Sequence, residues 1–266
     1  MFDLTDRVAV VTGVLGKLGP IWARALLEAG AGVAGIDLAG ASESDEFDGL
    51  LESYGADRLR LYDGDVLDRD SLAQAREAIE HDLGPVSILV NNAGIDQPPG
   101  KVEGCHLHEI PAEAVRRVLD VNVVGLLQAA QVFGAVMVER GSGSIINIGS
   151  LYASVSPDAR FYDHLAVDPP FLKPPAYGAS KAAVINLTKY LATHWGPRGV
   201  RVNALSPGGV LGGQDEEFQR KFNARVPLGR MAEARDLGGP LVFLASDASS
   251  YVNGIELRVD GGYTAW

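Results

Sequence analysis

Short apolar segments alternate with longer amphipathic segments along this chain of 266 residues. The short segments are rich in β-branched residues, which is typical of buried strands, and the longer segments repeat apolar residues at helical spacing. Strands are predicted at Val8–Thr12, Val33–Leu38, Arg58–Tyr62, Ile88–Asn91, Ser144–Ile148, Val200–Leu205 and Ile255–Val259. Helices are predicted at Leu18–Ala29, Arg69–Leu83, Ala112–Glu139, Ala176–Trp195, Asp215–Ala224 and Ala232–Ser246.

Alternating strands and helices, with strands that are apolar throughout, predict a parallel sheet covered by helices on both faces. Neither a repeat nor a low-complexity linker divides the chain. We therefore expect residues 1–266 to form a single domain of the α/β class, a doubly wound Rossmann fold.

Composition narrows the range of partners. The formal net charge is −11, and an acidic surface argues against a nucleic acid or an anionic membrane as partner. Cys105 is the only cysteine, so no internal disulfide is possible, and nothing around it has the spacing of metal ligands. The N-terminus is polar, unlike a signal peptide, and we expect no apolar run long enough to cross a bilayer. These features predict a cytoplasmic protein without a metal site.

A glycine-rich turn follows the first predicted strand. Gly13 and Gly16 allow a tight turn and let backbone N–H groups approach a pyrophosphate, beside Lys17 and Leu18 at the start of the next helix. Asp37 ends the second strand, where a carboxylate accepts both hydroxyls of an adenosine ribose and repels a 2′-phosphate. Asp37 therefore favours NAD over NADP, whereas the cation of Lys17 favours an additional phosphate.

Two further strand ends carry residues suited to a nucleotide. Asp65 and Val66 follow the third strand and are candidates to lie beside the adenine, although an ordinary turn aspartate fits this position nearly as well. Asn92, Ala93 and Gly94 follow the fourth strand, where small residues allow close approach of a cofactor. The asparagine amide at this point can tie the strand end to its neighbour.

Tyr177 and Lys181 lie four residues apart on a predicted helix and share one face. An ammonium group beside a phenol stabilises the phenolate, so we expect the pKa of Tyr177 to fall toward neutrality. Tyr177 would then serve as a general acid or base. Such a pair also arises often by chance on the surface of a helix.

Together these motifs resemble the classical branch of the short-chain dehydrogenase/reductase family over nearly the whole chain. The resemblance also rests on Asn122 in Val-Leu-Asp-Val-Asn, Ser150 in Asn-Ile-Gly-Ser, Arg201-Val-Asn-Ala-Leu-Ser-Pro-Gly and Val259-Asp-Gly-Gly. It implies an NAD-dependent oxidoreductase that transfers a hydride between the cofactor and a secondary alcohol or ketone.

The resemblance also implies a role for each catalytic residue. Tyr177 would exchange a proton with the substrate oxygen, and Ser150 would hydrogen-bond that oxygen. Lys181 would lower the pKa of Tyr177 and bind the nicotinamide ribose. Asn122 would support a water chain that relays protons from Lys181. At the nicotinamide end, the resemblance places the cofactor against Tyr177, Lys181, Pro207, Gly208 and Val210.

The chain departs from the family pattern in its glycine segments. Gly16 stands one place earlier than the middle glycine of the classical branch, so the loop resembles the extended branch of sugar-nucleotide epimerases and dehydratases. The threonine that usually contacts the nicotinamide amide is absent near Gly212, which leaves backbone groups near Val210 for that role. The glycines after Pro207 predict a mobile lid at about 208–225.

A third departure is an insertion at about 151–175, which separates Ser150 from Tyr177 more widely than is usual in the family. It carries polar groups of both signs, including Asp158, Arg160 and Lys173. They predict a small polar substrate, such as a sugar or sugar derivative. A loop that faces solvent or another subunit fits the same composition.

The C-terminal half has a weaker resemblance to a bacterial subgroup of the flagellin-modification protein A type, which is associated with surface-sugar biosynthesis. Two other functions stay open: a redox-neutral sugar-nucleotide epimerase or dehydratase, and a non-catalytic NAD(H)-sensing protein. The family resemblance also implies a homodimer or homotetramer, paired through the helices predicted at Ala112–Glu139 and Ala176–Trp195.

Overall fold

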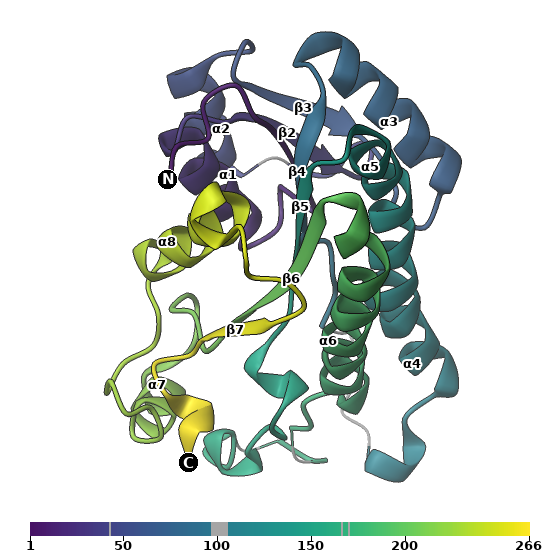
Figure 1. Ribbon diagram of the computed structural model, residues 1–266. Helices are drawn as coiled ribbons and strands as arrows, with labels where there is room; N and C mark the ends of the chain where they lie inside the picture. Colours follow the sequence, from purple (N-terminus) through teal and green to yellow (C-terminus); the bar gives the residue numbers. More distant parts are fainter. Residues whose placement is uncertain (43, 97–105, 166, 170) are drawn as a thin grey trace.

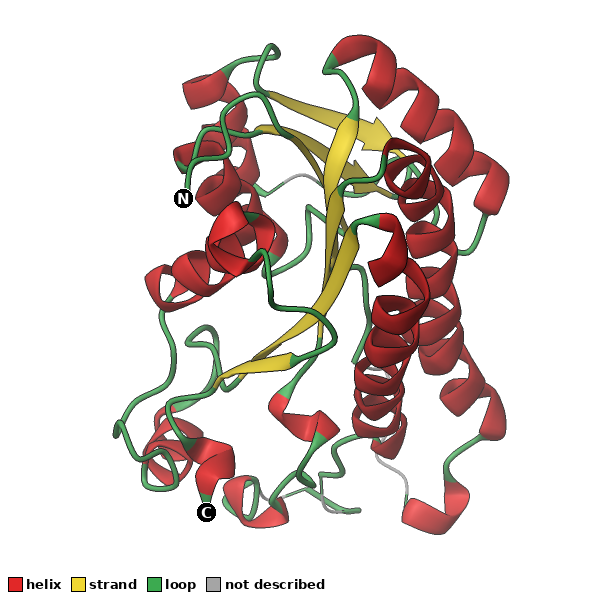
Figure 2. Ribbon diagram, viewed as in Figure 1, coloured by secondary structure: helices red, strands yellow, loops and turns green. Residues whose placement is uncertain are grey.

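The computed structural model describes residues 1–42, 44–96, 106–165, 167–169 and 171–266, so Cys105 lies outside the described residues. The strands form one parallel sheet in the order β3-β2-β1-β4-β5-β6-β7 (Figures 1 and 2). They are β1 Val8–Thr12, β2 Gly32–Asp37, β3 Leu59–Asp63, β4 Val86–Asn91, β5 Gly143–Ile148, β6 Val200–Pro207 and β7 Glu256–Val259. The predicted strands and the doubly wound α/β fold are confirmed.

Helices cover both faces of the sheet (Figure 1). One face carries α1 Gly19–Glu28, α2 Asp45–Tyr54 and α8 Ala234–Ala245, and the other carries α3 Arg69–Asp82, α4 Ala112–Leu119, α5 Leu126–Arg140 and α6 Pro175–Trp195. Trp22 and Phe47 are fully buried in the core of the first face, and Phe133 and Met137 in that of the second. Two apolar cores therefore hold the sheet between them.

The helix predicted at Ala112–Glu139 is divided by a π-helical turn, η2 Asp120–Gly125. Such turns are rare and frequently mark functional sites, because the wider turn re-aims the side chains on either side of it. Gly125 allows Val66 to pack directly against this turn, since a Cβ atom at position 125 would stand 2.7 Å from Cγ2 of Val66. Asn122 lies inside the turn, so the local change of helix geometry sets the direction of its side chain.

Helix α2 was missed by the sequence prediction, which assigned no element between Leu38 and Arg58. Ser44 caps this helix by accepting a hydrogen bond from the backbone N–H of Phe47, and three acidic residues occupy its first turn. These capping signals were present in the sequence. The helix is short, has Gly49 in its middle and buries only Phe47 and Leu50, so few apolar residues mark it in the sequence.

The stretch Ala112–Arg140 is long and apolar enough to cross a bilayer by length and composition, contrary to the expectation that no such run exists. Half of its most apolar window is buried inside the protein. Phe133 and Met137, for example, pack in the core cluster with residues of the sheet. Core packing therefore accounts for the hydrophobicity of this segment.

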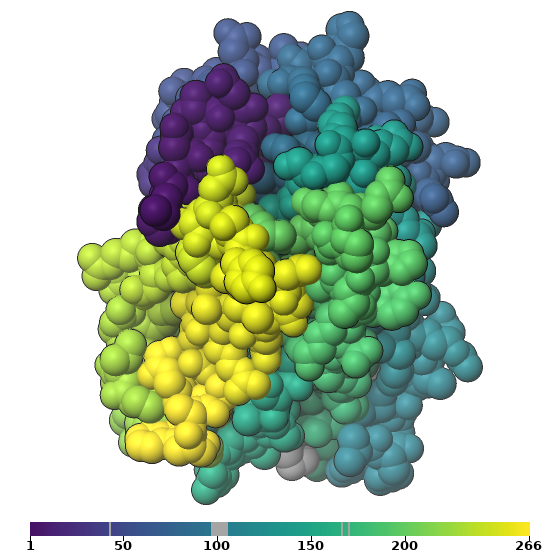
Figure 3. Space-filling model, viewed as in Figure 1, coloured from purple at the N-terminus to yellow at the C-terminus, as the bar shows by residue number. Residues whose placement is uncertain are grey.

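The first part of the predicted insertion packs against α7 Glu216–Asn223, whereas Leu165, Val167 and Phe171 further along it are exposed. Leu151 and Phe161 of the insertion share a third apolar cluster with Phe218, Phe222 and Tyr263. The space-filling view shows the yellow C-terminal segment lying against the green chain around α7 (Figure 3). The first part of the insertion, α7 and the C-terminus therefore form one packed unit beside the carboxyl ends of β5 and β6, and the mobility of residues 208–225 stays a prediction.

Candidate active site

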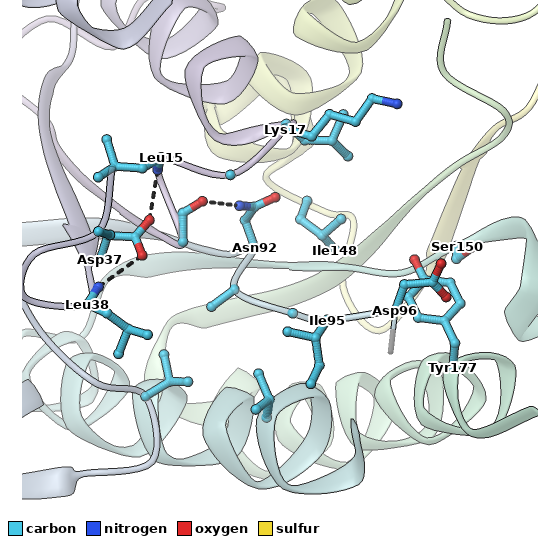
Figure 4. A pocket seen from close by; sticks show the side chains of 18 of the residues that line it. Leu15, Lys17, Asp37, Leu38, Asn92, Ile95, Asp96, Ile148, Ser150 and Tyr177 are labelled. Atoms are coloured by element: carbon cyan, nitrogen blue, oxygen red, sulfur yellow. Dashed lines mark hydrogen bonds between the residues drawn. The ribbon is translucent and has the colours of Figure 1, made fainter. Parts of the chain in front are cut away.

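A cavity of about 620 Å³ follows the carboxyl ends of the strands, where open parallel sheets bind their ligands (Figure 4). Every cofactor-binding residue predicted from the sequence lines it, together with three of the four predicted catalytic residues. They are Gly13, Gly16, Lys17, Leu18, Asp37, Asp65, Val66, Asn92, Ala93, Gly94, Ser150, Tyr177, Lys181, Pro207, Gly208 and Val210. Asn122 is the exception, and it lies behind Ile95.

The glycine-rich turn is shaped for close approach of a phosphate group. Gly13 has a φ of +64°, and a Cβ atom at this position would stand 2.8 Å from Cα of Ala93. Helix α1 begins at Gly19 and opens its N-terminus toward the same turn, which favours negative charge. The turn therefore fits the pyrophosphate of a dinucleotide, even though its middle glycine is displaced to Gly16.

Lys17 and Asp37 lie at different ends of this region. Asp37 accepts hydrogen bonds from the backbone N–H groups of Leu15 at 2.8 Å and Leu38 at 2.9 Å, so its carboxylate is fixed at the end of β2. Lys17 extends away from it (Figure 4). A Cβ atom at Gly212 would stand 2.5 Å from Nζ of Lys17, which places the ammonium beside the segment after β6.

Asn92 ties the end of β4 to the glycine-rich turn, as the sequence indicated. Its amide nitrogen donates to the carbonyl oxygens of Thr12 at 3.0 Å and Gly13 at 2.9 Å. Its amide oxygen accepts from the indole of Trp22 at 2.8 Å. Three hydrogen bonds thus hold two walls of the cavity at a fixed separation.

Ser150, Tyr177 and Lys181 meet at the far end of the cavity (Figure 4 shows the first two). The Lys181 side chain is almost fully buried, and its Nζ lies 5.6 Å from the centre of the Tyr177 ring. The ammonium donates to the carbonyl oxygen of Ile148 at 2.7 Å. This contact fixes Lys181 beneath the tyrosine.

The expected fall in the pKa of Tyr177 is not seen. Burial raises the pKa of Tyr177 to about 12; a hydrogen bond with Ser150 lowers it, and the charge of Asp96 raises it further. Burial also lowers the pKa of Lys181 to about 8. Loss of hydration penalises the charged form of both groups and is the largest effect on each pKa.

Asn122 organises the site from behind. Its amide oxygen accepts from the backbone N–H of Ile95 at 2.8 Å, and its amide nitrogen donates to the Ile95 carbonyl at 2.9 Å and to Oγ of Ser180 at 2.9 Å. Ser180 in turn donates to the carbonyl oxygen of Tyr177 at 2.7 Å. One buried amide therefore links the loop after β4 to the helix turn that carries the tyrosine.

Sequence reasoning missed Asp96, which also lines the cavity. Its carboxylate pairs with Nζ of Lys173, a residue of the insertion. The available signal was its place just after the Asn92-Ala93-Gly94 motif, but a single acid in a loop has no spacing that points to a site.

The segment near Val210 is also organised by a residue that the sequence did not single out. The Gln214 amide accepts from the backbone N–H of Gly212 and donates to the carbonyl oxygen of Val210, at 2.8 and 2.9 Å. The Val210 carbonyl already accepts a hydrogen bond from Gln214. That backbone groups near Val210 bind the nicotinamide amide therefore stays a prediction.

Comparison with known proteins identifies the family. A family model described as enoyl-(acyl carrier protein) reductase matches residues 13–264. Galactitol 2-dehydrogenase (L-tagatose-forming) from Cereibacter sphaeroides is 36% identical, over 100% of this chain and 98% of that protein. The chain belongs to the short-chain dehydrogenase/reductase family. It is therefore an oxidoreductase that uses a nicotinamide cofactor.

Other members of the family show the same extent of similarity. D-threitol dehydrogenase from Mycolicibacterium smegmatis is 34% identical, over 99% of this chain and 95% of that protein. A crystal structure of a gluconate 5-dehydrogenase from Burkholderia cenocepacia, in complex with NADP and tartrate, has a TM-score of 0.84 and 30% identity, over 100% of this chain and 98% of that chain. A short-chain dehydrogenase from Leptospira borgpetersenii with bound NAD⁺ has a TM-score of 0.83 and 30% identity, over 98% of this chain and 94% of that chain.

Replacing Asn122 tests its organising role. Asn122→Ala leaves both backbone groups of Ile95 without their amide partner, so we expect a loss of about 1–3 kcal/mol in the free energy of unfolding. We also expect kcat/KM to fall roughly 10- to 100-fold, because a small displacement of positioned groups has a large effect on rate. Urea denaturation and steady-state kinetics measure the two effects.

Asn203→Ala is the matched control. Asn203 is also buried and also bonds two backbone groups, those of Val252 and Ile255, but outside the cavity. It should destabilise the protein to a similar degree while kcat/KM stays within about threefold of the parent. Equal losses of kcat/KM in the two variants would show that Asn122 acts only through stability.

Proposed function

We propose that this enzyme transfers a hydride between NAD(H) and a secondary alcohol or ketone of a small polar substrate, a polyol or a sugar derivative. The observation that carries the proposal is the meeting of Ser150, Tyr177 and Lys181 at one end of the cavity whose other end holds Asp37. Relatives that match the whole chain are named as dehydrogenases of galactitol and D-threitol, which supports a polyhydroxylated substrate.

Each residue has a part in the proposed reaction. Bound cofactor supplies the hydride acceptor or donor. Tyr177 removes the proton of the substrate hydroxyl during oxidation and returns it to the ketone oxygen during reduction. Ser150 donates a hydrogen bond to the same oxygen and so holds the reacting carbon in place. Lys181 supplies the positive charge beside the phenol, and Asn122 positions both the tyrosine turn and the loop at Ile95.

NAD is the proposed cofactor on the strength of Asp37. Its fixed carboxylate ends β2, where it would meet the adenosine ribose, and a 2′-phosphate there would face a like charge without the Lys17 ammonium to offset it. Similar structures carry either NADP or NAD⁺, so the preference rests on this geometry. The cytoplasmic location, the oligomeric state and the tie to surface sugars stay predictions from the sequence.

Tyr177→Phe tests the proposed mechanism. We expect NADH formation to fall at least about 1,000-fold across a panel of polyols, because the substrate proton loses its acceptor while the ring and its packing remain. Quenching of tryptophan fluorescence checks that cofactor binding is kept. Tyr190→Phe is the control, since Tyr190 lies exposed on the same helix and should leave the rate within about twofold. Undiminished turnover in Tyr177→Phe would contradict the mechanism.

Asp37→Ser tests the cofactor preference. The parent enzyme should favour NAD over NADP in kcat/KM, and the variant should shift this ratio toward NADP by roughly 10- to 100-fold, because the repulsion of the 2′-phosphate is removed. Lys17→Met should leave the ratio within about threefold, since its ammonium points away from Asp37. A parent enzyme that prefers NADP, or a ratio that moves with Lys17 and not with Asp37, would refute the preference for NAD.

A further inference from the structure

An ion pair joins two segments at the substrate end of the cavity. The carboxylate of Asp96, in the loop after β4, pairs with Nζ of Lys173, near the end of the insertion. The same Nζ lies 5.8 Å from the centre of the Tyr177 ring. Figure 4 shows Asp96 at the end of the cavity that holds Ser150 and Tyr177. The pair is thus close enough to the reacting groups to meet a neighbouring part of the substrate.

The position of Asp96 is set by the catalytic machinery itself. Ile95 precedes it in the chain, and both backbone polar groups of Ile95 are bonded to the Asn122 amide. One carboxylate oxygen of Asp96 takes the Lys173 ammonium, while the other, Oδ1, is inaccessible to solvent and has no hydrogen-bond partner among the described residues. The Asp96 side chain is nevertheless 43% exposed, so the accessible oxygen, Oδ2, can accept a hydrogen bond from a ligand hydroxyl beside its bond to Lys173.

The other cations of the insertion and α7 are also compensated. Arg160 of the insertion pairs with Asp158, and in α7 Arg220 pairs with Glu217 and Lys221 with Asp163; Arg225, just after α7, also pairs with Asp158. Within the described part of the insertion and α7, each of these cations therefore already has a carboxylate. A substrate carboxylate would have to displace one of these acids, and near Tyr177 it would face the charge of Asp96 as well.

We infer that Asp96 and Lys173 are specificity-determining residues that select a neutral polyhydroxylated substrate over a sugar acid. The Asp96 carboxylate accepts a hydrogen bond from a substrate hydroxyl beside the reacting carbon, and the Lys173 ammonium donates to the oxygen of a neighbouring hydroxyl. A vicinal diol supplies both groups without net charge, whereas a carboxylate at the same place is repelled by Asp96. This inference rests on the proposed function and adds the charge class of its substrate.

Matched substrate pairs test the inference. We would measure NAD-dependent oxidation of polyols with four to six carbons and of the aldonic acids with the same carbon chains. The parent enzyme should favour the best polyol over its matched acid by at least about tenfold in kcat/KM. Asp96→Asn should lower kcat/KM for the polyol by about 10- to 100-fold, mainly through KM, and raise it for the acid by at least about threefold, because the repulsion is lost and the Lys173 ammonium is left to meet the substrate carboxylate.

Two variants and one further readout separate recognition from folding. Asp163→Asn changes an acid of the same insertion that lies outside the cavity, and it should leave both substrates within about twofold. Lys173→Met should lower kcat/KM for the polyol without improving that for the acid, because Asp96 then keeps its full negative charge. The pH profile of kcat in Asp96→Asn should move to lower pH, since the Asp96 charge raises the pKa of Tyr177.

The outcomes distinguish this inference from the function on which it rests. A parent enzyme that prefers the acids while still requiring Tyr177 would overturn the inference and leave the hydride transfer standing. Equal losses for both substrates in Asp96→Asn would also overturn it, since they indicate a structural role. If the parent oxidises neither class, the proposed function fails, and the selectivity built on it fails too.

Discussion

The arrangement of the active site depends on the hydrogen bonds made by the buried side-chain amide of Asn122. It bonds both backbone groups of Ile95 and the hydroxyl of Ser180, so it joins the loop after β4 to the helix that carries Tyr177. Such an arrangement is stable only if all its polar groups are paired, because an unpaired buried amide costs about 1–3 kcal/mol. The π-helical turn at Asp120–Gly125 gives this amide its direction, and the close packing of Gly125 on Val66 accompanies the turn. Helix geometry, loop position and the alignment of the tyrosine are therefore coupled.

Burial shifts the pKa values of both Lys181 and Tyr177 in the active site. Lys181 is almost fully buried, with the Ile148 carbonyl as a hydrogen-bond acceptor, and burial lowers its pKa to about 8. The same loss of hydration raises the pKa of Tyr177. In its protonated form, the Tyr177 phenol beside the buried Lys181 ammonium can donate a proton to a ketone. Oxidation of an alcohol requires the deprotonated form of Tyr177, which accepts the proton of the hydroxyl. The Asp96 carboxylate nearby adds a negative charge, which raises the pKa of Tyr177 further.

Much of the fold and the cofactor groove could be predicted from the sequence, because each depends on local patterns. The strands are marked by runs of β-branched residues. The glycine-rich turn at Gly13 and the acid at Asp37 each follow the end of a strand, and the parallel sheet brings these strand ends together at the cavity. Helix α2 was missed because it is short and acidic and buries only Phe47 and Leu50, which left its N-cap as the main signal. Asp96 and its pairing with Lys173 escaped because only the folded insertion brings these two residues together. The predicted direction of the shift in the Tyr177 pKa was wrong, because the four-residue spacing of Tyr177 and Lys181 does not show how deeply the two side chains are buried.

An isotope label shows directly whether this enzyme transfers a hydride from its substrate to the nicotinamide. A polyol deuterated at its secondary carbons would be incubated with NAD⁺ and the enzyme, and the reduced nicotinamide examined by NMR. The proposed hydride transfer predicts deuterium at C4 of the nicotinamide ring, in amounts equal to the ketone formed, because the hydride passes directly from the substrate carbon held at Ser150 and Tyr177. Ketone or isomer formed without deuterium in the nicotinamide would contradict it.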